Sequence, residues 1–158
     1  MFVDTSLIRF SAAECFLDNI GIGGNSYPGS GKFGVQDYLT CQKSCQLDPQ
    51  CQGFSYLFSR KWCGKKLSLT NLNEGTGDLI ISGPKMCPCF KWNKTQVGTE
   101  MVPMLEHVAT DHECQERCQY TEGCTAFSYE LTTGYCHLYS EELNVVDKEG
   151  FISGPVLC

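Results

Sequence analysis

The sequence of 158 residues lacks several features that would assign it to common classes of protein. It has no run approaching the roughly 20 apolar residues that cross a bilayer, and its first residues lack the basic and then apolar pattern of a signal peptide. Basic residues are outnumbered, because 12 Lys and Arg accompany 18 Asp and Glu, and no basic stripe with interleaved aromatic residues occurs. We therefore expect neither membrane insertion nor nucleic-acid binding.

Residues suited to catalysis are also scarce. The three histidines are His107, His112 and His137, and the first two are five residues apart rather than the four of a helical zinc pair. No serine lies in a Gly-x-Ser-x-Gly context, which marks the nucleophile of many hydrolases. We expect no catalytic residues, no metal site and no cofactor.

Cysteine, in contrast, is abundant, with 12 residues. Cytosolic reductants keep thiols reduced, whereas small secreted domains depend on disulfides, so an even and dense set of cysteines predicts an oxidising compartment. The protein is expected to be secreted or extracellular. Because the first residues show no signal peptide, we expect the chain to be a mature form or an excised piece.

The cysteines form two sets of six with matching spacing. Successive steps are 26, 4, 6, 12 and 24 residues from Cys15 to Cys87, and 25, 4, 6, 12 and 22 residues from Cys89 to Cys158. Phe-Ser-Tyr follows the fourth cysteine of each set by three residues, and Ile-Ser-Gly-Pro precedes the last. The period of about 72 residues is the size of a small domain, so the chain consists of two copies of one module.

Each copy is predicted to hold one helix and short strands. Cysteines four residues apart lie on one face of a helix, which is expected over Val35–Leu47 and again over Thr110–Tyr120. Thr110 followed by Glu113 has capping-box spacing. β-rich runs follow each helix, with Phe54, Tyr56, Phe127 and Tyr129 expected in the core. The predicted fold class is α+β, with two tandem disulfide-rich modules, each one helix on a small antiparallel sheet.

These cysteine spacings and motifs resemble the PAN/apple domain over nearly the whole chain. Six cysteines alone allow fifteen pairings. The resemblance implies that the first pairs with the sixth, the second with the fifth and the third with the fourth. The implied disulfides are Cys15–Cys87, Cys41–Cys63, Cys45–Cys51, Cys89–Cys158, Cys114–Cys136 and Cys118–Cys124. The expected domains are an N-terminal extension (1–14), apple domain 1 (15–87) and apple domain 2 (89–158).

Tandem apple domains joined by a residue or two resemble those of apicomplexan micronemal adhesins, which include galactose-binding lectins. This resemblance implies a non-enzymatic, extracellular adhesion module, secreted through the microneme, that binds galactose-terminated glycans on host cells. It equally allows a module that docks onto another secreted adhesin or receptor without binding sugar. The residues that differ between the two copies should distinguish the two functions.

The strand around the fifth cysteine supplies the candidate carbohydrate-binding residues of the first copy. They are Lys61, Trp62, Lys65 and Lys66. Side chains alternate along a strand, so Trp62 and Lys66 should share the face opposite Cys63. An aromatic ring can stack on a pyranose while charged groups hold its hydroxyls. Alternatively, Trp62 covers a disulfide or packs on the neighbouring module.

The second copy supplies the candidate partner-binding residues. Its charge is −7 over residues 89–158, against +2 over residues 15–87, so it could attract a basic partner or simply keep the surface soluble. By strand parity, Tyr135, His137 and Tyr139 should form an outward stripe. Glu141 and Glu142 follow this stripe and are included in the expected interface.

Three further segments carry weaker predictions. Asn93-Lys94-Thr95 is an N-glycosylation sequon. The glycine-rich segment from Ile20 to Lys32 is predicted to be a loop. Residues 1–14 are expected to be partly disordered or to pair with a sheet edge.

Overall fold

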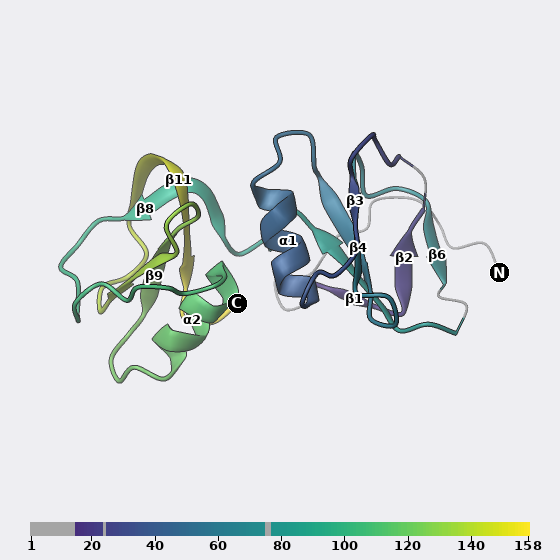
Figure 1. Cartoon of the computed structure of the whole chain (residues 1–158). Helices are drawn as coiled ribbons and strands as arrows, with labels where there is room; N and C mark the ends of the chain where they lie inside the picture. Colours follow the sequence, from purple (N-terminus) through teal and green to yellow (C-terminus); the bar gives the residue numbers. More distant parts are fainter. Residues whose placement is uncertain (1–14, 24, 75–76) are drawn as a thin grey trace. The chain divides into compact units, whose positions relative to one another are not determined.

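The structure is a computed structural model that describes residues 15–23, 25–74 and 77–158. The expectation for residues 1–14 lies outside this range. The described chain divides into two compact units, the first ending at Pro88 and the second beginning at Cys89 (Figure 1). Among the described residues, no helix is both long enough and apolar enough to span a membrane.

The first unit is a helix on an antiparallel sheet. Its helix is α1 (Tyr38–Gln46), and its five-stranded sheet has the order β1-β7-β4-β5-β3. A two-stranded sheet, β2-β6, accompanies it. The strands are β1 (Leu17–Asp18), β2 (Ile20–Ile22), β3 (Gly31–Lys32), β4 (Gly53–Leu57), β5 (Trp62–Lys66), β6 (Leu72–Glu74) and β7 (Ile80–Pro84). The glycine-rich segment is therefore not only a loop, because β2 and β3 form at its two ends.

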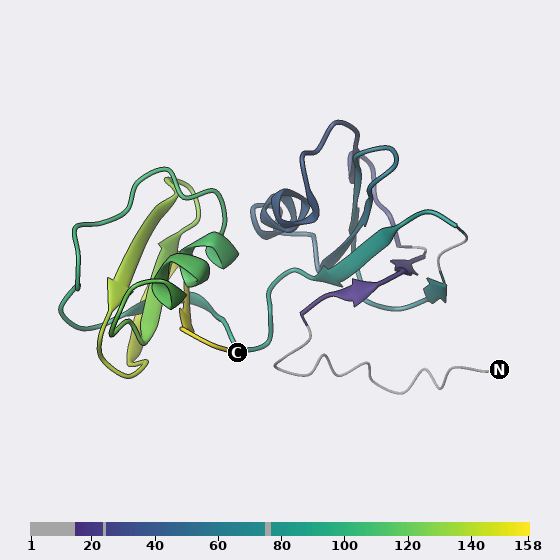
Figure 2. The same ribbon diagram turned by 90° about the horizontal axis from the view of Figure 1, so that it is seen from below.

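The second unit repeats this plan with fewer and longer strands. The helix α2 (Asp111–Gln119) lies across one face of a four-stranded antiparallel sheet of order β10-β9-β11-β8 (Figure 2). The strands are β8 (Lys91–Gln96), β9 (Ala126–Glu130), β10 (Tyr135–Tyr139) and β11 (Val145–Pro155). Both units thus confirm the predicted α+β fold of one helix on an antiparallel sheet.

Both helices begin at side-chain caps. Asp37 Oδ1 accepts a hydrogen bond from Thr40 N at 2.7 Å, and Thr110 Oγ1 accepts one from Glu113 N at 3.1 Å. Glu113 in turn accepts a hydrogen bond from Ala109 N, which lowers the pKa of its carboxyl. These bonds satisfy amides that the first helical turn leaves unpaired. The cap predicted at Thr110 is confirmed, and both helices start a few residues inside or at the predicted boundary.

Each core forms where the helix meets the sheet. Phe54 and Tyr56 in β4, and Phe127 and Tyr129 in β9, are fully buried, as predicted. Alternation along a strand places both aromatic residues of each pair on the helix side.

The buried ends of the two tyrosines hold the segment that precedes each helix. Tyr56 OH donates to Val35 O at 2.8 Å, and Tyr129 OH donates to Val108 O at 3.0 Å. Each hydroxyl lies within hydrogen-bonding distance of one further carbonyl, so its single proton is shared between the two acceptors of the turn before the helix.

A second buried anchor lies on the other side of each sheet. Ser55 Oγ accepts a hydrogen bond from Ile22 N at 2.9 Å and pairs with Ser82 Oγ. The equivalent Ser128 Oγ accepts one from Gln96 N at 2.6 Å and pairs with the corresponding serine of β11. In both units, the hydroxyl of the equivalent serine therefore fixes the segment before the helix to the sheet.

Six disulfides complete the two units. The structure contains Cys15–Cys87, Cys41–Cys63, Cys45–Cys51, Cys89–Cys158, Cys114–Cys136 and Cys118–Cys124, the pairs that the resemblance implies. Two disulfides of each unit tie the helix to the segment that follows it. The third closes the unit between its first and last cysteines.

Candidate functional site

Trp62, at the start of β5, lies flat along the sheet because two glycines face it. Gly64 is two residues further on the same strand, and Gly31 pairs with it from β3. A Cβ atom at Gly64 would overlap the indole, and one at Gly31 would lie 3.1 Å from its Nε1. The ring therefore rests on bare backbone and is half-buried, which leaves part of it open to solvent.

Lys66 lies on the same side of the sheet as Trp62, as strand parity predicts. Its Nζ is 5.8 Å from the centroid of the indole, within range of a cation–π interaction, and 3.0 Å from Ser26 Oγ. Lys66 is only 6% exposed, and this burial lowers the pKa of its ammonium group. The expectation that Lys66 contacts a sugar needs correction, because its side chain is buried and its ammonium group is bonded to Ser26.

Lys65 does not join this surface. It shares the helix-side face with Cys63, and its Nζ lies 2.5 Å from Asp48 Oδ2. Lys61 is exposed in the turn before β5, with a left-handed backbone at φ 46°. Of the four predicted carbohydrate-binding residues, the structure brings together Trp62 and Lys66, leaves Lys61 nearby at the turn and places Lys65 on the opposite face.

Asp48 organises a polar cluster just after α1. Its carboxylate accepts hydrogen bonds from Lys65, from Tyr27 OH at 2.8 Å and from Gln50 N at 3.0 Å. The Lys65 hydrogen bond is the main reason why the pKa of Asp48 falls to about 2. Burial, followed by the bond to Asp48, raises the pKa of Tyr27. The cluster ties the glycine-rich segment and β5 to the end of the helix.

We expect this cluster to make the first unit acid-sensitive. A carboxyl with a lowered folded-state pKa favours folding where it is ionised, so the stabilisation is present above its ordinary pKa of 3.8 and is lost as the pH falls towards 2. After solvent screening, the lost contribution is about 1 kcal/mol. Urea unfolding at pH 5 and at pH 2 should show the loss in the wild type and a smaller one in Asp48→Asn. Asp78→Asn, at an exposed carboxyl of the same unit, should behave as wild type; an equal loss in Asp48→Asn would contradict the assignment.

The predicted aromatic stripe of the second unit is only partly exposed. Tyr135 and His137 are half-buried, whereas Tyr139 is 6% exposed. The Tyr139 hydroxyl forms hydrogen bonds with the side chains of Ser128 and Thr95, and its burial raises its pKa. The prediction of an outward Tyr139 is wrong, because strand parity does not reveal that Thr95, at the end of β8, lies over this face.

The neighbouring acidic residues are differently placed. His137 Nδ1 contacts Glu100 Oε1, and the segment holding Glu100 bridges to β10 opposite Tyr139. Glu141 and Glu142 are exposed in the turn after β10, where the sequence predicts them. They remain a predicted interface.

Asn93, the glycosylation candidate, lies within β8. It is half-buried, its backbone is left-handed at φ 51°, and its Oδ1 accepts a hydrogen bond from Gly150 N at 3.1 Å. Its glycosylation remains a prediction.

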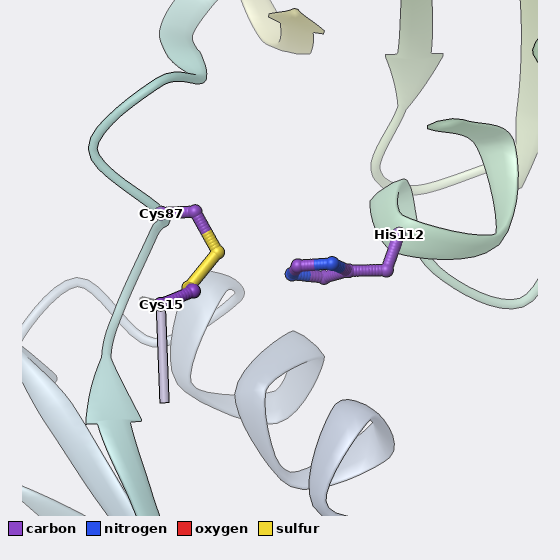
Figure 3. Close-up of side chains that lie close together, drawn as sticks. All are labelled: Cys15, Cys87 and His112. Carbon is purple, nitrogen blue, oxygen red and sulfur yellow. A yellow bond between two sulfur atoms is a disulfide. The ribbon is translucent and has the colours of Figure 1, made fainter. Parts of the chain in front are cut away.

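All twelve cysteines take part in disulfides, so none offers a thiolate to a metal ion or a substrate. Figure 3 shows this for the Cys15–Cys87 pair of the first unit, whose sulfur atoms are bonded to each other. His112, drawn in the same figure, extends from α2, and its ring centroid lies 5.2 Å from that of Phe90. Burial lowers the pKa of His112, which favours its neutral form.

Comparison with known protein families agrees with this architecture. Two family models, each described as a PAN domain, match residues 23–66 and residues 87–154, and together they cover more than two thirds of the chain. The chain belongs to the PAN domain family. Its two units are tandem PAN/apple modules. Trp62 and the two glycines beneath it belong to the first module.

Two individual proteins are similar to this chain in sequence. Micronemal protein 4 of Toxoplasma gondii is 26% identical over 137 residues, covering 75% of this chain and 23% of that protein. A PAN domain-containing protein of Acanthamoeba polyphaga mimivirus is 23% identical over 104 residues, covering 66% of this chain and 47% of the relative. The chain thus spans less than half the length of these curated relatives.

A solved structure of two N-terminal apple domains of Toxoplasma gondii microneme protein 4 is also similar. It is 20% identical, with a TM-score of 0.38, and the match covers 87% of this chain and 86% of that one.

The two glycines that position Trp62 were not among the residues predicted from the sequence. A signal was present, since Gly64 of the first PAN module aligns with His137 of the second. The second module has a histidine side chain at this position, so the fold tolerates one. The glycine of the first module therefore indicates that another group, the indole of Trp62, fills the space.

Proposed function

We propose that the chain is a non-enzymatic, extracellular adhesion module, secreted through the microneme, that binds galactose-terminated glycans of host cells. Its family and its similarity to a micronemal protein support an adhesion role. The observation that supports a glycan ligand is the indole of Trp62, laid flat on Gly64 and Gly31 with part of the ring open to solvent. An aromatic ring held parallel to the surface can stack on the apolar face of a pyranose.

The surrounding groups suit the hydroxyls of a sugar. Lys66 Nζ donates a hydrogen bond to Ser26 Oγ and lies 5.8 Å from the centroid of the indole, so this bond fixes the ammonium group near the ring. Lys61, in the adjacent turn, is exposed and able to reach a ligand at the rim. In this proposal Trp62 binds the ring of the sugar, Lys61 contacts its hydroxyls, and Lys66 positions the indole. Lys65 has no part in binding, because Asp48 holds it on the other face.

Removal of the indole tests the proposed site. We expect Trp62→Ala to weaken binding of galactose-terminated glycans on an array about 10- to 100-fold, because burial of an aromatic side chain contributes about 1.5–3 kcal/mol. Tyr135→Ala, at the matching position of the second module, is the control and should bind as wild type. Circular dichroism should show that both variants keep the native fold.

Two results would reject the glycan site. Unchanged glycan binding by a folded Trp62→Ala protein would place the ligand elsewhere. An array without any hit for the native protein would leave docking onto another secreted protein as the function.

A further inference from the structure

The helix-side face of the first module continues beyond the residues that α1 covers. Phe58 and Leu79, which follow β4 and precede β7, extend this face and are 37% and 50% exposed. They are adjacent, since Phe58 N donates to Leu79 O at 3.2 Å. The ring centroids of Tyr56 and Tyr38 lie 5.0 and 6.3 Å from that of Phe58. An apolar surface therefore runs from the core to solvent.

The second module closes the same place. Leu131 occupies the position of Phe58 and is 4% exposed, and Gly150 occupies that of Leu79. The backbone is equivalent, because Leu131 N donates to Gly150 O at 2.9 Å. The fold thus does not require exposed apolar side chains here. The first module exposes a phenylalanine and a leucine, whereas the second has a buried leucine and a glycine at these positions. Exposed apolar surface of this kind is typical of interaction sites.

Charges of opposite sign lie on the two sides of this apolar surface. Asp18 is in the edge strand β1, where it pairs with Ile81 of the neighbouring strand β7. Paired residues share a face, so the side chain of Asp18 lies on the helix side of the sheet. Asp18 is close enough to Tyr38 to contribute to its raised pKa, after burial and Asp37. Arg60 lies on the other side, in the turn between β4 and β5, and is exposed. Across the sheet, from β1 to the turn before β5, these positions follow the order Asp18, Leu79, Phe58, Arg60.

We propose that this surface is a homodimer interface, in which the first modules of two copies pair about a two-fold axis through Phe58 and Leu79. A two-fold interface brings the same patch of both copies together in reversed order. Asp18 then lies opposite the partner's Arg60, and Arg60 lies opposite the partner's Asp18. A partner with one sign of charge would meet repulsion at one end, whereas a second copy matches both ends.

The proposed interface has an apolar centre and a charged rim, as most protein interfaces do. The central apolar side chains provide most of the affinity, and the charges at the rim select the orientation. A patch of this kind predicts weak association, with a dissociation constant on the order of tens of micromolar. The inference does not depend on the glycan site, which lies on the other face of the sheet. A dimer would carry two copies of the proposed glycan site, which would increase its avidity for a surface with many glycans.

Analytical ultracentrifugation of the full chain between about 5 and 500 µM tests the dimer. We expect concentration-dependent self-association that Leu79→Lys weakens by at least tenfold. Tyr120→Lys, at an 83% exposed position of the second module, is the control and should associate as wild type. A native chain that remains monomeric at the highest concentration would overturn the proposal, and so would equal association of all three proteins.

Charge reversal tests the two-fold arrangement itself. Asp18→Arg and Arg60→Asp should each weaken self-association, because like charges then face each other at both ends. A mixture of the two variants should restore dimerisation, since each reversed charge meets an opposite charge on the other copy, and the double variant in one chain should also associate. A mixture no more associated than its components would overturn the arrangement, even if the native chain dimerises.

Discussion

Reduction of the disulfides is expected to unfold both modules. The disulfides of the first module span 72, 22 and 6 residues, and those of the second span 69, 22 and 6. In the chain-entropy model such links contribute roughly 4, 3 and 2 kcal/mol, or about 9 kcal/mol per module. This sum is comparable to the whole free energy of unfolding of a small domain. A module of about 70 residues has too small a core to replace it.

The loss of folding can be followed by near-ultraviolet circular dichroism and thermal melting with and without reductant. We expect the aromatic signal and the melting transition to disappear after reduction and alkylation. Chain treated with alkylating agent alone should keep both, because no free thiol is present. Retention of the native melting point by the fully reduced chain would show that the cores suffice without their disulfides.

Truncation of one core phenylalanine is expected to unfold one module and spare the other. Phe127 is completely buried in β9, and its ring centroid lies 5.2 Å from that of Phe90. Phe127→Ala removes this packing and leaves a cavity, which costs about 3–5 kcal/mol. Because each module has its own core, Phe54→Ala should have the same effect on the first module alone.

Hydrogen exchange resolved by peptide distinguishes the two variants. In Phe127→Ala we expect faster exchange in β9, β10 and β11, with residues of β4, β5 and β7 protected as in the native chain. The reverse should hold for Phe54→Ala. Faster exchange across both modules in either variant would show that the two cores unfold as one cooperative unit.

The helices and the core could be predicted because their determinants are local. Thr110 and Glu113 are three residues apart, so the cap they form depends on the helix alone. Phe54 and Tyr56 are two residues apart on either side of Ser55, and alternation along a strand places both on one face. The cysteine spacing is repeated in both copies, which is why one pattern indicated both modules.

The functional surfaces depend on contacts between distant segments, which the sequence does not reveal. Parity correctly placed Trp62 and Lys66 on one face, but the burial of Lys66 depends on Ser26, forty residues away. Lys65 was grouped with them by adjacency, although the alternation of β5 sends it to Asp48. Strand parity alone predicted an exposed Tyr139. The prediction failed because the groups that bind its hydroxyl, Thr95 and Ser128, come from other strands.

The hydroxyl anchors shared by the two modules separate a constant frame from a variable insert. Ser55 and Tyr56 hold the two ends of residues 23–34, and Ser128 and Tyr129 hold those of residues 97–107. The insert of the first module brings Tyr27 to Asp48 and Gly31 to Trp62, whereas that of the second brings Glu100 to His137. The insert of one module can therefore change in evolution while the serine and tyrosine anchors keep the fold, much as antibody loops vary on a fixed framework.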